Sequence, residues 1–542
     1  MSDATIAPVP KHRFAIFFAS FLTLIAAGGG FAIRTGILGD WAAEYGFTMS
    51  ELGQITGGGF VGFGVVILFA SLITDRVGYR AIMMMAFVCH VVSAIITLAA
   101  TPIYNAYGQD ATFNCLYIGM FVFAVGNGLC EAAINPLVAT LYPNRKTHYL
   151  NILHAGWPGG MILGAILAKL FAGEEAVITQ LPWEIPMCFF LVPTAIYGFI
   201  TIKEKFPISE ARAAGMTFGR MLAQFASPLL ILLLVLQVCV GFVELGTDSW
   251  IPKITNEIVT GQGLYLFMWA SGIMFVLRFF AGPIVEKINP FGLLFCSACL
   301  GAVGLYLIGL SAVAEASAAV FAVWAAVTIY GVGKSFYWPT MLGIVGEQFP
   351  RGGAITMGAV GGAGMLSAGL LGGPGIGYMQ DYFASEKLQQ LSSATYERYA
   401  AEQTNQFLAF PEVLGLDGQK VAVVRDGSEA GPGTELAATV ERLADKGVEN
   451  DEIAALSTWW RTTAEADAPS DEPAVAEAML YGGKMALWYT ALVPVFMAIC
   501  YLSLVIYFHF RGGYRQVHID APEPVEKHEG EEYTGGVPAP VR

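Results

Sequence analysis

The chain has 542 residues, of which 55% are hydrophobic and 13% charged, and its formal net charge at pH 7 is −14. A soluble domain carries about 25% charged residues to cover its surface, so this composition excludes an ordinary soluble protein. We expect an integral membrane protein, and its 63 glycines are typical of helices that pack closely within a bilayer.

Twelve apolar runs of about 20 residues or more predict twelve membrane-spanning helices. The runs lie near residues 14–35, 52–74, 79–100, 114–141, 148–172, 183–202, 228–250, 262–285, 290–312, 316–341, 352–379 and 485–509. They predict an all-α membrane protein with two pseudo-symmetric halves of six helices. The predicted segments are an N-tail (1–13), a first half (14–202), a linker (203–227), helices seven to eleven (228–380), an insertion (381–484), helix twelve (485–509) and a C-tail (510–542).

Lysine and arginine are distributed unevenly between the two sides of this arrangement. Fourteen of them lie in the two tails, the linker and the short loops on the same side, whereas the short loops of the opposite side contain only Lys253. Because cytoplasmic loops are enriched in lysine and arginine, we expect both termini and the linker to be cytoplasmic. The predicted location is the plasma membrane, or the inner membrane of a Gram-negative bacterium.

The predicted insertion at residues 381–484 contains nineteen acidic and eight basic residues. Its position between helices eleven and twelve places it outside the cell. Helical periodicity over residues 437–443 and 453–460 predicts either a small helical cap or a partly disordered loop. Such a segment is a candidate contact surface for an outer partner.

The first motif lies between the second and third apolar runs, in Ser71-Leu-Ile-Thr-Asp75-Arg76-Val-Gly78-Tyr-Arg80. Gly78 permits a tight turn, and Asp75 can lie at the N-terminus of a neighbouring helix. This D-R-x-G-x-R pattern resembles the signature loop of the major facilitator superfamily, which implies the twelve-helix fold and solute transport. We interpret the loop as a cytoplasmic gate, although a cluster that only sets membrane orientation has the same charges.

The second half contains a weaker version of this motif, Gly282-Pro-Ile-Val-Glu286-Lys287, after the eighth apolar run. Arg278 precedes it by one or two helical turns. We therefore assign Arg278 and Glu286 to the cytoplasmic gate as well.

The fourth apolar run contains a carboxylate in Gly126-Asn127-Gly-Leu-Cys-Glu131-Ala-Ala-Ile-Asn135-Pro136. An acid within the bilayer must face a cavity or a partner, because its charged form is costly in hydrocarbon. This stretch, with the later Asn151-Ile-Leu-His154-Ala-x-Trp157, resembles the L-fucose permease branch of the superfamily. The resemblance implies that Glu131 takes part in proton coupling and sugar binding, with Asn127, Asn135, His154 and Trp157 nearby.

Arg34 is a departure from that branch, whose members carry a second acid in the first helix; the nearest acid here is Asp40. Arg34 has two equal interpretations. It binds a carboxylate or phosphate through both guanidinium nitrogens, or it forms a fixed salt bridge with Glu131.

The seventh and tenth runs supply further candidates. Gln237, Glu244 and Asp248 are spaced by seven and four residues and so share one helical face. Lys334 needs an acid, and Glu244 or Asp248 are its expected partners. Tyr337 and Trp338 either stack on a ligand or pack in the core.

No nucleotide-binding, metal-binding or catalytic motif is visible, so we expect no enzyme activity, cofactor or metal. The leading hypothesis is proton-coupled uptake of a sugar or polyol. The alternative is an organic-anion carrier that uses Arg34 and Lys334, followed by a nutrient sensor whose insertion binds an outer partner.

Overall fold

The computed structural model describes residues 12–47, 49–57, 59–173, 176–311, 316–426, 431–446 and 450–519. The predicted N-tail lies outside these residues up to residue 11, and the predicted C-tail lies outside them from residue 520. Within the described residues eleven helices are long and apolar enough to cross a membrane, and α15 (Gly263–Arg278) is a shorter apolar helix of 16 residues. The arrangement agrees with the expected twelve spans.

The first six spans form one bundle of helices. They are α1 (Arg13–Gly36), α3 and α4 (Met49–Gly57, Gly59–Val77), α5 and α6 (Tyr79–Leu98, Ala100–Tyr107), α7 (Gln109–Leu141), α8 (Lys146–Phe171), and α9 with α10 (Glu184–Cys188, Leu191–Lys203). A short helix, α2 (Leu38–Tyr45), follows the first span. Helices α11 (Glu210–Ala213), α12 (Phe218–Leu222) and the 3-10 turn η1 (Ala223–Ala226) occupy the linker.

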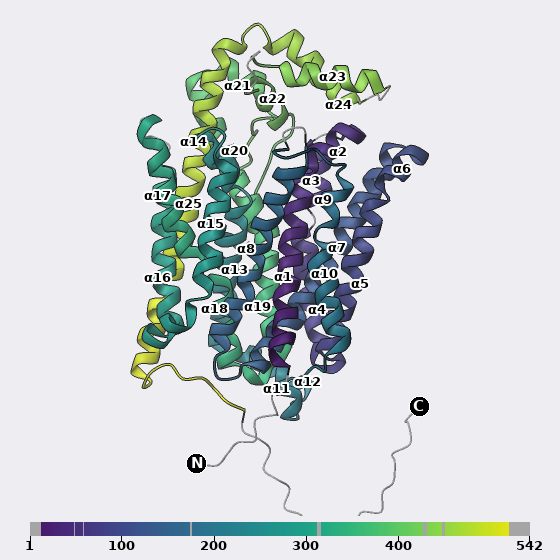
Figure 1. Cartoon of the computed structure of the whole chain (residues 1–542). Coiled ribbons are helices and arrows are strands. Elements are labelled where there is room, and N and C mark those ends of the chain that lie inside the picture. The colour runs from purple at the N-terminus through teal and green to yellow at the C-terminus, as the bar shows by residue number, and fades with distance from the viewer. Residues whose placement is uncertain are drawn as a thin grey trace, which may run out of the picture.

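The second bundle begins with α13 (Pro228–Gly241), which continues through the π-helical turn η2 (Phe242–Gly246). After α14 (Ile251–Ile258) and α15 come α16 (Ala281–Ser311), α17 (Ala316–Lys334), α18 (Tyr337–Gln348) and the turn η3 (Pro350–Gly352). The eleventh span is α19 (Gly353–Ser367), η4 (Ala368–Gly372) and α20 (Gly373–Leu391), and the twelfth is α25 (Ala468–Phe510). Figure 1 shows the two bundles side by side, with α1 beginning and α25 ending at the same end, which we call the terminal end.

Glycines allow the closest helix contacts within each bundle. A Cβ atom at Gly164 of α8 would lie 2.6 Å from the carbonyl oxygen of Gly29 on α1. Gly241 of α13 meets the backbone of Gly364 on α19 even more closely. Larger side chains would separate these helices, so the glycines set the width of each bundle.

The eighth span is shorter than predicted, because the run near 262–285 divides into α15 and the start of α16. Pro283 lies in the first turn of α16, where proline is tolerated since no helical partner awaits its missing N–H group. The backbone then bends at Asn289, which has a φ of 56° just before Pro290. The weak second copy of the motif therefore forms a helix start and a kink.

Residues 392–467, which we call the cap, lie beyond the spans at the end opposite the termini, the cap end (Figure 1). The cap contains α21 (Ser393–Tyr399), α22 (Gly418–Val424), α23 (Thr434–Lys446), α24 (Asp451–Trp459) and the π-helical turn η5 (Trp460–Ala464). Helices α23 and α24 cover the two stretches with helical periodicity. The cap has a core of its own, which includes Tyr399, Val424 and Trp460.

Two membrane helices extend into this cap. α20 continues to Leu391, and α25 already begins at Ala468, so both ends of the predicted insertion are helical extensions of spans. Arg398 of α21 binds Asp471 of α25 with two hydrogen bonds of 2.8 and 2.9 Å. The cap is thus joined firmly to the second bundle.

Candidate functional site

A buried chain of polar side chains begins in the first bundle. Asn135 donates from Nδ2 to Glu131 Oε2 at 2.6 Å, one helical turn away on α7. His154 of α8 donates from Nε2 to Asn135 Oδ1 at 2.9 Å, so that in the neutral imidazole Nδ1 is the acceptor, 3.9 Å from Glu131 Oε1. Glu131 is 4% exposed and His154 3%. The sequence-predicted trio of acid, amide and imidazole is therefore assembled, with a proton acceptor facing the carboxylate.

Arg278 of α15 connects this chain to the second bundle. Its Nη2 donates to Glu244 Oε1 at 2.9 Å, its Nη1 to the backbone oxygen of His154 at 2.6 Å, and its Nε to the backbone oxygen of Ser335 at 2.7 Å. Its side chain is 2% exposed. All five donors of a guanidinium point in one plane, so three separate acceptors on α8, η2 and the α17–α18 junction are held together.

Two prolines make those backbone oxygens available. Pro158 lies inside α8, four residues after His154, and Pro339 lies in the first turn of α18, four residues after Ser335. Because proline has no N–H group, the carbonyl four residues earlier loses its helical hydrogen bond. Arg278 takes up one such carbonyl from each bundle.

This position corrects the sequence-based assignment of Arg278 to the cytoplasmic gate. Arg278 lies in the central polar chain, and Glu286 binds Arg145 instead, at 2.8 Å on an exposed surface. Arg278 and Glu286 are near in sequence but have different partners, because the break between α15 and α16 separates them.

A second buried ion pair lies in the second bundle. Lys334, at the end of α17, pairs with Asp248, one of its two expected partners. The Lys334 ammonium group also lies 5.2 Å from the centre of the Tyr330 ring. Glu244 is thereby left to Arg278 and to the backbone N–H of Trp338, which donates to Glu244 Oε2 at 3.3 Å.

Gln237 and Trp338 lie close together beside Gly364. A Cβ atom at Gly364 would be 2.7 Å from both Gln237 Nε2 and the Trp338 ring. Gln237 is fully buried, yet neither its nitrogen nor its oxygen has a hydrogen-bond partner among the described residues. Buried amides are almost always paired, so Gln237 is an exception among the described residues.

The other candidates lie away from this chain. The Tyr337 hydroxyl donates to Ser297 O at 3.0 Å, which turns it toward α16. Asn127 accepts from His90 Nε2 at 2.9 Å inside the first bundle. Trp157 lies 6.3–6.4 Å, centre to centre, from the rings of Phe31 and Phe63.

Arg34 does not form the salt bridge with Glu131 that was one of its two interpretations, and its other interpretation, binding of a carboxylate or phosphate, stays a prediction. Its Nη2 donates to Ser93 Oγ at 2.8 Å, and its guanidinium carbon lies 3.9 Å from the centre of the Phe123 ring. Among the described residues it forms no salt bridge with Glu131. Arg34 is 1% exposed, and stacking on aromatic rings replaces part of the hydration that it loses.

Contacts between the two bundles also form at the terminal end. Asp75 accepts from the backbone N–H of Ala354, the second residue of α19, at 2.8 Å, as expected for an acid at a helix N-terminus. Gly78 has a φ of 96°, and Arg80 donates to the backbone oxygens of Thr201 and Ile202. Arg76 contributes its backbone oxygen to Arg212.

Sequence reasoning missed further contacts between the bundles. Lys146 donates to Gly346 O at 3.1 Å, and Thr147 donates to Glu347 Oε1 from its hydroxyl at 2.7 Å. At the centre Asn151 donates to Thr340 Oγ1 at 3.1 Å. Pro158 and Pro339 gave a readable signal for the freed carbonyls, but nothing in the sequence pairs Lys146 or Thr147 with residues 200 positions later.

Known proteins share this fold. A family model described as Major Facilitator Superfamily matches residues 16–373. The L-fucose-proton symporter of Escherichia coli (strain K12) is 23% identical over 149 residues, which are 27% of this chain and only 31% of that protein.

Solved structures with the same fold cover most of the chain. The transporter FucP in its outward conformation has a TM-score of 0.55 at 17% identity, covering 69% of this chain and 92% of its own. The proton:xylose symporter XylE, bound to 6-bromo-6-deoxy-D-glucose, has a TM-score of 0.55 at 13% identity, covering 71% and 90%. A bacterial homologue of the human lysosomal transporter Spinster, inward-facing, reaches 0.55 at 15% identity over 91% and 97%. With its family match over residues 16–373, its buried charges and its two helical bundles, the chain belongs to the major facilitator superfamily of membrane transporters.

Proposed function

We propose that this protein is a secondary active transporter that couples proton movement to the uptake of a sugar or related polyol by alternating access. The observation that carries the proposal is the continuous buried chain Glu131–Asn135–His154–Arg278–Glu244, which joins the two bundles. A titratable acid at one end and an ion pair at the other make the contact between the bundles sensitive to a proton.

The chemistry of coupling follows from the geometry. A proton on Glu131 removes a negative charge from the first bundle, and the unprotonated Nδ1 of His154 lies within 3.9 Å of the carboxylate. The backbone of His154 is held by Arg278, so a shift of this ring acts directly on the contact between the bundles. Proton binding and bundle movement thereby become linked.

The sugar or polyol assignment rests on a different set of residues. The unpaired amide of Gln237 beside the Trp338 ring offers hydrogen bonds together with an apolar surface, which suits a ring bearing hydroxyl groups. The L-fucose-proton symporter and the proton:xylose symporter XylE, which are both similar to this chain, support the same class of solute. Transport of an organic anion has less support, because Lys334 is paired with Asp248 and Arg34 stacks inside the first bundle.

The proposal includes the orientation of the protein. Fourteen lysines and arginines on the side of the terminal end support an orientation with that end in the cytoplasm and the cap outside. The contacts of Asp75 and Thr147 then close the cytoplasmic side.

The test uses purified protein in liposomes that contain a trapped pH dye, with sugars, polyols and small carboxylates added in turn. We expect one hydroxylated solute to acidify the interior. Glu131→Gln should abolish this acidification but leave solute counterflow, because exchange needs no net proton movement. The control is Glu397→Gln on the exposed surface of the cap. Acidification by carboxylates alone, or unchanged coupling in Glu131→Gln, would contradict the proposal.

A further inference from the structure

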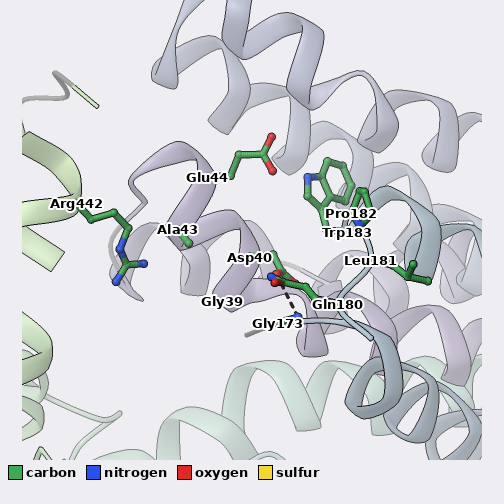
Figure 2. Close-up of a pocket in the computed structure, with 10 residues that line it drawn as sticks. All are labelled: Gly39, Asp40, Ala43, Glu44, Gly173, Gln180, Leu181, Pro182, Trp183 and Arg442. Atoms are coloured by element: carbon green, nitrogen blue, oxygen red, sulfur yellow. Dashed lines mark hydrogen bonds between the residues drawn. The ribbon is translucent and has the colours of Figure 1, made fainter. Parts of the chain in front are cut away.

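A pocket with a volume of about 670 Å³ lies at the cap end, between the cap and the first bundle. It is far from the central polar chain in sequence and in fold. Figure 2 shows its lining, which comes from α2, from the segment between α8 and α9, and from one cap residue, Arg442 of α23. The volume falls within the range of about 300–1,000 Å³ that is usual for small-molecule sites.

The floor of the pocket is acidic. Asp40, Ala43 and Glu44 share one face of α2, because residues three and four positions apart are neighbours on a helix. Asp40 Oδ1 accepts from the backbone N–H of Gly173 at 3.2 Å, and Glu44 Oε1 accepts from Thr101 Oγ1 at 3.2 Å. These bonds hold the carboxylates in place, and one hydrogen bond leaves Glu44 with lone-pair positions for further donors, since a carboxylate offers roughly four.

An indole group forms one wall. Trp183 lines the pocket and is 2% exposed, and its Nε1 has no hydrogen-bond partner among the described residues. Figure 2 shows the nitrogen-bearing edge of this ring on the side of Glu44, with Gln180 along the same rim. A buried indole N–H normally finds an acceptor, so this group is available for one.

Arg442 faces the acids from the opposite side. Its side chain is exposed, and within the described ranges it forms no ion pair or hydrogen bond. The cap that carries it is fixed to the second bundle, since Arg425 pairs with Glu257 of α14, whereas the acids belong to the first bundle. A hydrogen bond from Asn450 Nδ2 to Gly46 O at 3.1 Å joins the cap to the first bundle near the pocket.

The charges decide between classes of solute. Two carboxylates and one guanidinium leave the lining with a net negative charge, under an insertion with nineteen acidic and eight basic residues. Such a site repels organic anions. Carboxylate, amide, guanidinium and indole groups together can donate to and accept from several hydroxyl groups at once.

We propose that this pocket is a vestibule site that binds a neutral sugar or polyol before it reaches the central polar chain. The inference rests on the proposed function for its substrate class. It adds a second binding position, which is built from the first bundle and the cap; because the cap is joined to the second bundle, the pocket changes shape when the bundles move. Arg442 and Glu44 hold the hydroxyl groups, and the Trp183 indole N–H donates to one of them.

The test measures access to the pocket directly, using full-length protein in nanodiscs. Ala43→Cys places a thiol in the lining, and its rate of reaction with a water-soluble maleimide is measured against the same panel of sugars, polyols and carboxylates. We expect a hydroxylated solute to slow labelling about fivefold. Arg442→Gln should raise the half-protecting concentration about tenfold, as expected for losing hydrogen bonds from a charged group. The matched change Glu441→Gln, one residue away and outside the pocket, should not.

Two further variants separate this site from the central one. Thr458→Cys, on the exposed surface of α24, should label at the same rate with or without solute, which excludes a general closure of the cap. Protection in the Ala43→Cys background should survive Glu131→Gln, even if proton coupling is lost or was never present. Protection by carboxylates or divalent cations alone, loss of protection with Glu131→Gln, or no protection by any hydroxylated solute would overturn the proposal.

Discussion

Arg278 has a role that follows from two missing hydrogen bonds. The carbonyl groups of His154 and Ser335 lose their helical partners because a proline stands four residues further on. Buried carbonyls need a donor, and a guanidinium can serve two of them while it also neutralises Glu244. The Arg278 side chain thereby pairs with two carbonyl groups that lack helical hydrogen bonds and with one buried carboxylate, and it connects the two bundles.

Removing either member of the buried pair should therefore destabilise the protein strongly. We expect Arg278→Gln and Glu244→Gln each to lower the free energy of unfolding by about 3–5 kcal/mol, since the remaining charge is left buried without a partner. The double variant should be less destabilised than the sum of the two. Reversible unfolding in detergent, analysed as a double-mutant cycle, measures this.

The exposed pair Arg145–Glu286 is the matched control. Its side chains are 54% and 65% exposed, and Arg145→Gln should cost less than about 1 kcal/mol. Equal losses at the two pairs, or strict additivity of the Arg278 and Glu244 variants, would contradict this account.

At the scale of whole elements, the start of α19 is the clearest mechanical contact at the terminal end. Gly353 has a φ of 54°, and a Cβ atom there would lie 2.5 Å from Asp75 Oδ2. The absence of a side chain lets the loop between α4 and α5 approach the first turn of α19. Asp75 then satisfies a backbone N–H group that has no helical partner.

Neutralising this acid should loosen the contact between the bundles. Asp75→Asn exchanges a charge-assisted hydrogen bond for a neutral one, a difference of about 1–1.5 kcal/mol or roughly tenfold in the population of open states. We expect amide hydrogens in the first turn of α19 to exchange about tenfold faster, measured by mass spectrometry. Asp110→Asn, in the first turn of α7 and exposed, is the control and should leave that exchange unchanged.

On the scale of the whole molecule, the cap adds a second contact between the bundles at the end opposite Asp75. Its core, around Tyr399, Val424 and Trp460, is separate from the core of the spans. Its two ends lie close together, because Thr395 Oγ1 donates to Asp471 Oδ1 at 2.7 Å. A short connection can therefore replace it.

Deleting residues 392–467 and joining α20 to α25 with a glycine-serine linker should leave a folded transporter. We expect turnover at saturating solute to be maintained and KM to rise, because Arg442 and the roof of the vestibule are lost. Transport in liposomes, after size-exclusion chromatography confirms a monodisperse protein, measures both. A monodisperse variant without transport would show that the cap belongs to the carrier itself, and normal KM would count against the vestibule. If an outer partner exists, its binding should be lost while transport remains.

The sequence predicted the parts of this molecule that depend on local composition. Apolar runs identify spans because each must cross the same thickness of hydrocarbon. That Glu131 must face a cavity or a partner follows from the cost of a charge in hydrocarbon, whereas the grouping of Asn135 and His154 with it came from the resemblance to the L-fucose permease branch. The borders of the insertion were less predictable, since polar residues 468–484 continue the helix of a span outside the hydrophobic region.

Partner choice among buried charges was not predictable in the same way. A salt bridge with Glu131 was one of two interpretations of Arg34, but the guanidinium contacts Ser93 and Phe123 on other helices. Arg278 was assigned to a gate because of its neighbours in sequence, whereas the turn between α15 and α16 separates it from them. Such pairings depend on how the helices are rotated and how deep each residue lies, and a single sequence does not specify either.

The 43-residue helix α25 runs without interruption from the terminal end into the cap. At 1.5 Å per residue it is roughly 65 Å long, so a tilt of ~10° about one end moves the other by about 11 Å. A small tilt of α25 at one end therefore displaces its other end by a large distance. Small rotations between the bundles are magnified at the cap, and the bond between Asn450 and Gly46 lies where the displacement is large. A pair of distance probes across that bond would report the transport cycle with far more sensitivity than probes beside the solute.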